Sequence, residues 1–87
     1  MNLNIFPYDM NQNLLSQANS GDRCIVLEIA PEPAELRSRL YALGVIPGSL
    51  LEILRFAPLG DPMQVKVGGS FISIRKAEAK IIQVKIE

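Results

Sequence analysis

The chain has 87 residues, 48% of them hydrophobic, and its nine basic side chains balance nine acidic ones. A chain of this length and composition builds one domain with a modest core, which excludes wholesale disorder and leaves little room for an enclosed active site. The balanced charge argues against nucleic acid or an anionic membrane as the partner, because such partners usually require a basic surface.

The sequence also lacks the signals of a membrane or secreted protein. No apolar run approaches the roughly 18–20 residues that span a bilayer, and residues 1–13 lack the basic and apolar segments of a secretory signal. Cys24 has no second cysteine with which to form an internal disulfide, which favours a reducing compartment. We therefore expect a cytoplasmic protein.

The beginning of the chain differs in character from the rest. Residues 1–12 are polar and rich in asparagine, and we expect them to form an N-terminal extension to a domain that covers residues 13–87. Within that domain, residues 14–19 are suited to one short helical turn before Gly21, which is a turn signal.

The first predicted strand covers residues 24–30, which are apolar and rich in β-branched side chains. Its alternation places Ile25, Leu27 and Ile29 toward the core and Cys24 on the opposite face.

A change of period predicts one short amphipathic helix within residues 31–43. Leu36, Leu40 and Leu43 recur at helical spacing and form one apolar stripe. Gly44 then stands where a left-handed C-terminal cap is expected.

A turn, a strand and a loop follow this helix. Pro47 and Gly48 have the residue types of a tight turn, and residues 49–57 read as the second strand. Residues 58–62 must form a loop, because its two prolines cannot donate hydrogen bonds to a sheet.

Residues 63–75 give the strongest hairpin signal. Two alternating segments flank Gly68 and Gly69, a pair suited to a two-residue turn. This loop length sets the register and places Lys66 opposite Phe71, both on the outer face.

Residues 76–79 favour a single helical turn, and residues 80–86 alternate again as a last strand. The sequence thus predicts a mostly β fold, a small SH3-like barrel of about five strands with one short helix inserted after the first strand. We expect the barrel to close on itself, because closure removes exposed sheet edges.

The sequence offers little chemistry for catalysis. It contains no histidine, the commonest general base and transition-metal ligand, and Cys24 lies in an apolar strand where a buried structural role is favoured. Glu28, Glu32 and Glu35 cluster in sequence, but without histidine or a second cysteine they are better read as solvated carboxylates. We therefore predict no enzyme, catalytic residue, cofactor or metal ligand, with weak association of a transition metal left open.

Nucleic-acid binding is the natural alternative for a small barrel. The basic and aromatic candidates for it are Arg55, Lys66, Phe71, Arg75, Lys76 and Lys80. A stacking platform needs more aromatic side chains than the one outward Phe71, together with net positive charge. The same Phe71–Lys66 face suits a protein partner better, because aromatic and long basic side chains are good interface anchors.

Three ordered blocks carry a resemblance to a known family. They are LYALGVIPG at 40–48, APLGDP at 57–62 and FISIRKAEA at 71–79. Their order and spacing resemble the FeoA family, ferrous iron transport protein A, over roughly residues 14–86. The resemblance implies an SH3-like fold and a cytosolic accessory role for the ferrous-iron permease FeoB, with the chain attached to the membrane only through that partner.

The docking surface expected for this partner combines the exposed helix face, the proline-flanked loop and the outward hairpin residues. Its candidate residues are Arg37, Tyr41, Leu59, Asp61, Lys66 and Phe71. Two other functions stay open at this point: a metal-binding or metal-responsive SH3-like domain whose carboxylates take iron, and a small nucleic-acid-binding barrel. Formation of a homo-oligomer is open as well.

Overall fold

The computed structural model describes residues 12–87. The predicted N-terminal extension at 1–12 lies outside the described residues except for Gln12, whose backbone begins the first strand. None of the helices in this described part of the chain is long and apolar enough to cross a membrane.

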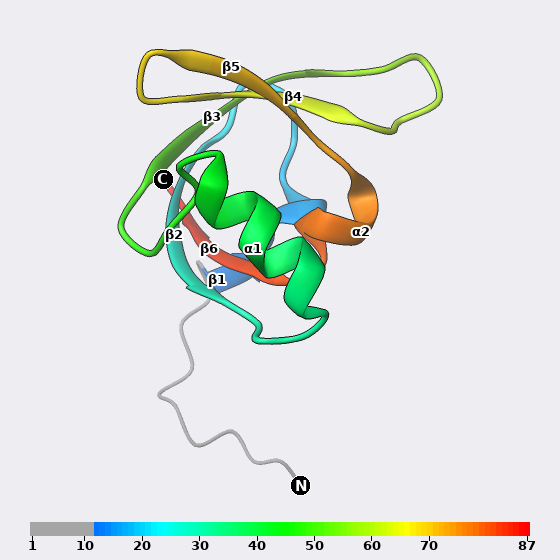
Figure 1. Cartoon of the computed structure of the whole chain (residues 1–87). Helices are drawn as coiled ribbons and strands as arrows, with labels where there is room; N and C mark the ends of the chain where they lie inside the picture. Colours follow the sequence, from blue (N-terminus) through cyan, green and yellow to red (C-terminus); the bar gives the residue numbers. More distant parts are fainter. Residues whose placement is uncertain (1–11) are drawn as a thin grey trace, which may run out of the picture.

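Six antiparallel strands form a single sheet (Figure 1). They are β1 (Gln12–Leu14), β2 (Arg23–Ile29), β3 (Leu50–Phe56), β4 (Met63–Val67), β5 (Ser70–Ile74) and β6 (Ile82–Ile86). The mostly β class and the last five strands were predicted. The additional strand, β1, has only three residues and no alternating pattern, so periodicity could not reveal it.

The prediction of a closed barrel is wrong. The strand order is β1-β6-β2-β3-β4-β5, and no pairing joins β1 to β5 in residues 12–87. After β5 the chain turns through α2 (Lys76–Ala79), and β6 then pairs with β2 and β1 rather than with β5. The sheet therefore curves around its core but keeps two edges, and Figure 1 shows α2 lying between the end of β5 and β6.

The helices agree with their predicted positions. The first short turn is the 3-10 helix η1 (Leu15–Gln17), and α1 covers Ala34–Ala42. Leu40 is fully buried, and the other two residues of the apolar stripe, Leu36 and Leu43, are half-buried. The stripe therefore packs α1 against the sheet. Gly44 has φ +91° and ends the helix as expected.

The predicted facing of β2 is partly wrong. Cys24 and Val26 are the buried residues, while Ile25 and Leu27 are only half-buried. The register against β6 shifts between Val26 and Glu28, and such a bulge exchanges the two faces of a strand. Beyond the shift Ile29 is buried, as the alternation had placed it.

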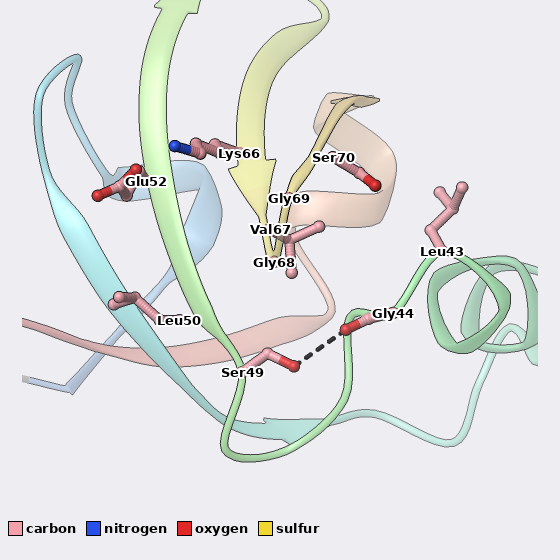
Figure 2. A pocket seen from close by; sticks show the side chains of 10 residues that line it. All are labelled: Leu43, Gly44, Ser49, Leu50, Glu52, Lys66, Val67, Gly68, Gly69 and Ser70. Atoms are coloured by element: carbon pink, nitrogen blue, oxygen red, sulfur yellow. Dashed lines mark hydrogen bonds between the residues drawn. The ribbon is translucent and has the colours of Figure 1, made fainter.

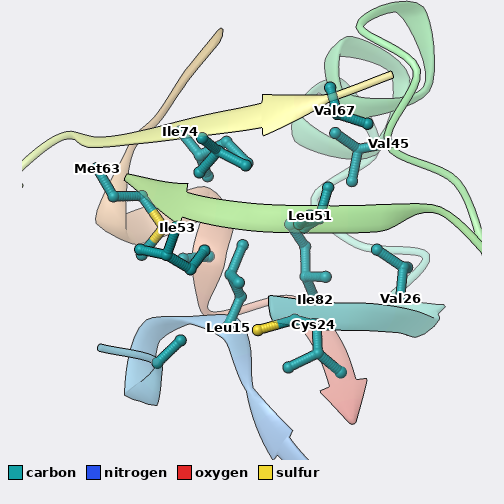
Figure 3. Close-up of a cluster of buried hydrophobic side chains, with 14 of the residues drawn as sticks. Leu15, Cys24, Val26, Val45, Leu51, Ile53, Met63, Val67, Ile74 and Ile82 are labelled. Atoms are coloured by element: carbon teal, nitrogen blue, oxygen red, sulfur yellow. The ribbon is translucent and has the colours of Figure 1, made fainter. Parts of the chain in front are cut away.

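A single apolar core lies inside the curved sheet and beneath the two α-helices (Figure 3). The core residues labelled in Figure 3 are Leu15, Cys24, Val26, Val45, Leu51, Ile53, Met63, Val67, Ile74 and Ile82. Because the interior is filled with side chains, functional chemistry must lie on the outer faces, in surface grooves or at the sheet edges.

Candidate interaction surface

The β4–β5 hairpin has the register that its two-glycine loop predicted. Lys66 is paired with Phe71 across the two strands, and Gly68 has φ +61° in the turn between them. Phe71 is 71% exposed, and Lys66 Nζ lies 5.9 Å from the centroid of its ring. The hairpin therefore presents an aromatic ring with a cation over its face, an arrangement that is stabilised electrostatically.

The outer face of β3, β4 and β5 is polar around this ring. Arg55 Nε donates to Gln64 Oε1 at 3.0 Å, and Gln64 lies opposite Ser73. Glu52 lies opposite Lys66. The exposed phenyl group thus stands among hydrogen-bonding and charged side chains, which is typical of a protein-binding surface rather than of an exposed core.

The loop before β4 holds the next two candidates, and they behave differently. Leu59 is 96% exposed and is the most exposed large hydrophobic residue of the described chain. Asp61 Oδ1 accepts a hydrogen bond from the backbone N–H of Lys76 at 2.9 Å. Asp61 therefore ties the loop to the start of α2, and one of its oxygens is committed to this structural bond.

The exposed face of α1 holds the remaining two candidates for the docking surface. Arg37 Nη2 donates to the Tyr41 hydroxyl at 3.2 Å, and the guanidinium carbon lies 4.7 Å from the centroid of the tyrosine ring. The spacing of four residues puts the two side chains on one face of α1. This is a second exposed pair of cation and aromatic ring.

The structure thus divides the six candidates into two groups. Leu59, Asp61, Lys66 and Phe71 belong to the β4–β5 hairpin and the loop that leads into it, and we call these four residues the hairpin surface. Arg37 and Tyr41 form a separate pair on α1, and no hydrogen bond or ion pair in residues 12–87 joins them to the hairpin surface.

An open groove of about 660 Å³ was not predicted (Figure 2). Its lining residues come from the end of α1, the following turn, β3 and the hairpin tip, and they are Leu43, Gly44, Ser49, Leu50, Glu52, Lys66, Val67, Gly68, Gly69 and Ser70. Ser49 Oγ donates to the Gly44 carbonyl at 3.0 Å and holds one wall in place. In the sequence, this groove was signalled only by glycines in the turn after α1 and in the hairpin tip. Sequence spacing alone does not show that these two turns lie close together in the fold.

The described carboxylates do not assemble a metal site. No group of three or more His, Cys, Asp or Glu side chains that could hold a metal ion occurs in residues 12–87. Glu28, Glu32 and Glu35, which are close in sequence, therefore form no such cluster.

The thiol of Cys24 is buried among core side chains (Figure 3). Burial, with smaller effects from the negative charges of Asp22 and Glu87, raises its pKa from 9.0 to about 11. The reactive thiolate is therefore scarce at neutral pH, in agreement with a structural role.

Fold and surface together define a small SH3-like β domain whose distinctive chemistry lies on exposed side chains. A family model for the FeoA domain matches residues 13–86, which is nearly the whole chain. The chain belongs to the FeoA family.

Solved structures agree with this assignment. The FeoA protein of Chlorobium tepidum is 46% identical, with a TM-score of 0.75 over 85% of this chain and 70% of that one. The FeoA-like protein of Clostridium acetobutylicum is 29% identical, with a TM-score of 0.82 over 90% of each chain. The predicted SH3-like fold is therefore confirmed, apart from its closure.

A curated relative places such a domain next to a transporter. It is the "Fe(2+) transport protein A/Fe(2+) transporter FeoB fusion protein" of Porphyromonas gingivalis, 25% identical over 72 residues. The match covers 83% of this chain and 8% of the fusion protein, so the chain spans only a small part of that relative.

Proposed function

We propose that this chain is a non-enzymatic accessory protein of ferrous iron uptake that binds the cytosolic part of a FeoB-type permease. The observation that carries the proposal is the Porphyromonas gingivalis fusion, in which a segment similar to this chain shares one polypeptide with a transporter named FeoB. Covalent linkage keeps two domains at a high effective concentration. We infer that a domain of this kind works by binding the permease, and this role places it in the cytoplasm.

The hairpin surface is the docking site that we propose. Phe71 is a large aromatic side chain held by a paired strand, and Lys66 covers one face of its ring. Rigid aromatic anchors bind with little loss of conformational entropy and often dominate interface energies. Leu59 adds apolar area at the loop.

Calorimetric titration of the full chain with the cytosolic region of the permease tests this site. We expect Phe71→Ala to weaken binding about tenfold or more, which corresponds to roughly 1.4 kcal/mol. Tyr41→Ala on α1 removes the other exposed aromatic ring and is the matched control. If Tyr41→Ala weakens binding and Phe71→Ala does not, the docking site lies on α1 instead.

Ferrous ion is the cargo of the permease in this proposal and needs no site on the accessory chain. Titration with ferrous ion under anaerobic conditions should therefore show no stoichiometric binding to the chain alone. A saturable heat at one ion per chain would favour a metal-responsive domain instead.

A further inference from the structure

Strand β5 forms one edge of the sheet. The two-residue turn makes Val67 and Ser70 a hydrogen-bonded pair, because the turn closes between its first and fourth residues. Such pairs alternate along an antiparallel ladder. The backbone N–H and C=O groups of Phe71 and Ser73 therefore point away from β4.

These backbone groups have no partner in residues 12–87. Strand β4 lies on the other side of β5, and no backbone bond from Phe71 or Ser73 to a turn or loop is present there. Strand β5 contains no proline, and its register with β4 runs without a bulge, so it lacks the usual devices that prevent pairing with another chain. The opposite edge strand, β1, is only three residues long.

Side chains around this edge carry positive charge. Arg75 follows β5 with an extended backbone, φ −75° and ψ 154°, so alternation puts its side chain on the same face as Phe71 and Ser73. The side chains of Arg75 and Lys76 are exposed, and neither forms an ion pair with the described residues. Lys66 completes a basic border along the strand.

Few acids oppose that charge. Residues 52–80 carry five basic and three acidic side chains, although the whole chain is neutral. Of the three acids, Glu52 lies opposite Lys66 and forms an ion pair with Arg23 at 3.7 Å. Glu78 is buried against Arg39, and Asp61 accepts the Lys76 N–H. Charge complementarity therefore favours an acidic occupant and disfavours a second copy of this chain, whose own basic residues would meet these across a β5–β5 junction.

We infer that the edge of β5 takes an extended, acidic segment of the protein partner as an additional strand. Main-chain bonds to Phe71 and Ser73 supply the affinity, and the basic border selects an acidic sequence. The inference rests on the proposed function, because the partner meant is the cytosolic region of the FeoB-type permease. It adds the mode of binding, which the proposed function leaves open.

Amide hydrogen exchange of the full chain, read by NMR, tests this mode directly. In the free protein the Phe71 and Ser73 amides should exchange rapidly, while the Ile72 amide, bonded to β4, should be protected. Saturation with the cytosolic region should slow Phe71 and Ser73 at least tenfold. Binding without that protection overturns the inference and leaves the proposed function standing, whereas absence of binding overturns both.

A matched pair of variants tests the outward N–H groups. Ser73→Pro removes an N–H that does not bond to β4, a position where edge strands tolerate proline, and it should weaken binding at least tenfold. Ser73→Ala keeps the N–H and should bind like the wild type. If Ser73→Pro fails to fold, the exchange measurement decides alone.

Charge reversal tests the acidic character of the occupant. Arg75→Glu should weaken binding at least tenfold at low salt, and the loss should shrink as salt is added. Lys85→Glu makes the same charge change on β6, four strands away, and should have little effect. Equal losses in both variants, or protection of Phe71 and Ser73 through self-association without the permease, would overturn the inference.

Discussion

The carboxylate of Glu78 lies 2.5 Å from Arg39 Nη1, although 39 residues separate the two in the chain. The second oxygen of Glu78 accepts the backbone N–H of Arg75 at 2.9 Å. Glu78 is only 2% exposed, so both of its oxygens are satisfied where water cannot reach them. This side chain joins α1 to α2 and closes the first turn of α2.

Removal of Glu78 should therefore destabilise the domain. We expect Glu78→Ala to lower the free energy of unfolding by roughly 1–3 kcal/mol, because a buried acceptor of two hydrogen bonds is lost. Glu78→Gln keeps one of the two acceptor oxygens and should lose less. Urea unfolding followed by circular dichroism measures both, with the exposed Glu35→Ala as the control. A Glu78→Ala variant as stable as the control would contradict this role.

Gly44 is a second test of local structure. Its φ of +91° belongs to the left-handed region, and a Cβ built there meets no atom within 4 Å. Any cost of substitution is therefore backbone strain rather than a clash. Gly44→Val should lower stability by roughly 1–2 kcal/mol, and Gly44→Asn by less, since asparagine tolerates this region better. An unchanged melting temperature for Gly44→Val would contradict the assigned helix end.

Local patterns predicted the elements that local rules control. The two glycines of the hairpin set its register, and with it the exposure of Phe71 beside Lys66. The leucine stripe and Gly44 likewise placed α1 and its end. In both segments, the residues that carry the pattern lie within about ten residues of the structure that they determine, so local rules suffice to predict it.

Features that depend on distant pairing were missed. The bulge after Val26, which reverses the facing of Ile25 and Leu27, arises from the register with β6. The contact between Arg39 and Glu78 joins two helices that are far apart in sequence. The open edges of the sheet likewise depend on which strands β6 pairs with. Periodicity contains no information on such long-range choices.

Burial of Cys24 predicts a specific pH dependence. Its pKa is raised from 9.0 to about 11 in the folded protein, so the unfolded state loses the thiol proton first. The contribution of this thiol to stability is fully present below about pH 9 and is lost as the pH rises toward 11. Unfolding midpoints measured from pH 8 to 11 should fall less in Cys24→Ala than in the wild type. Parallel curves for the two proteins would contradict the raised pKa.

Within the hairpin surface, Asp61 should hold the loop in place, and its loss should show first as a loss of stability. Its bond to the Lys76 N–H caps the start of α2, and losing such a cap costs about 1 kcal/mol. Asp61→Ala should therefore lower the melting temperature, while Asp61→Asn keeps an acceptor and should retain most of the stability. If Asp61→Asn is as stable as the wild type yet binds the permease far more weakly, the carboxylate itself contacts the partner.

Direct association with the permease is the central claim, and co-purification from native membranes tests it. The tagged full chain, added to detergent-solubilised membranes, should retain the FeoB-type permease in near-stoichiometric amount. Phe71→Ala should retain much less, and Tyr41→Ala about as much as the wild type. If folded wild-type protein recovers no permease, the chain does not work by binding it.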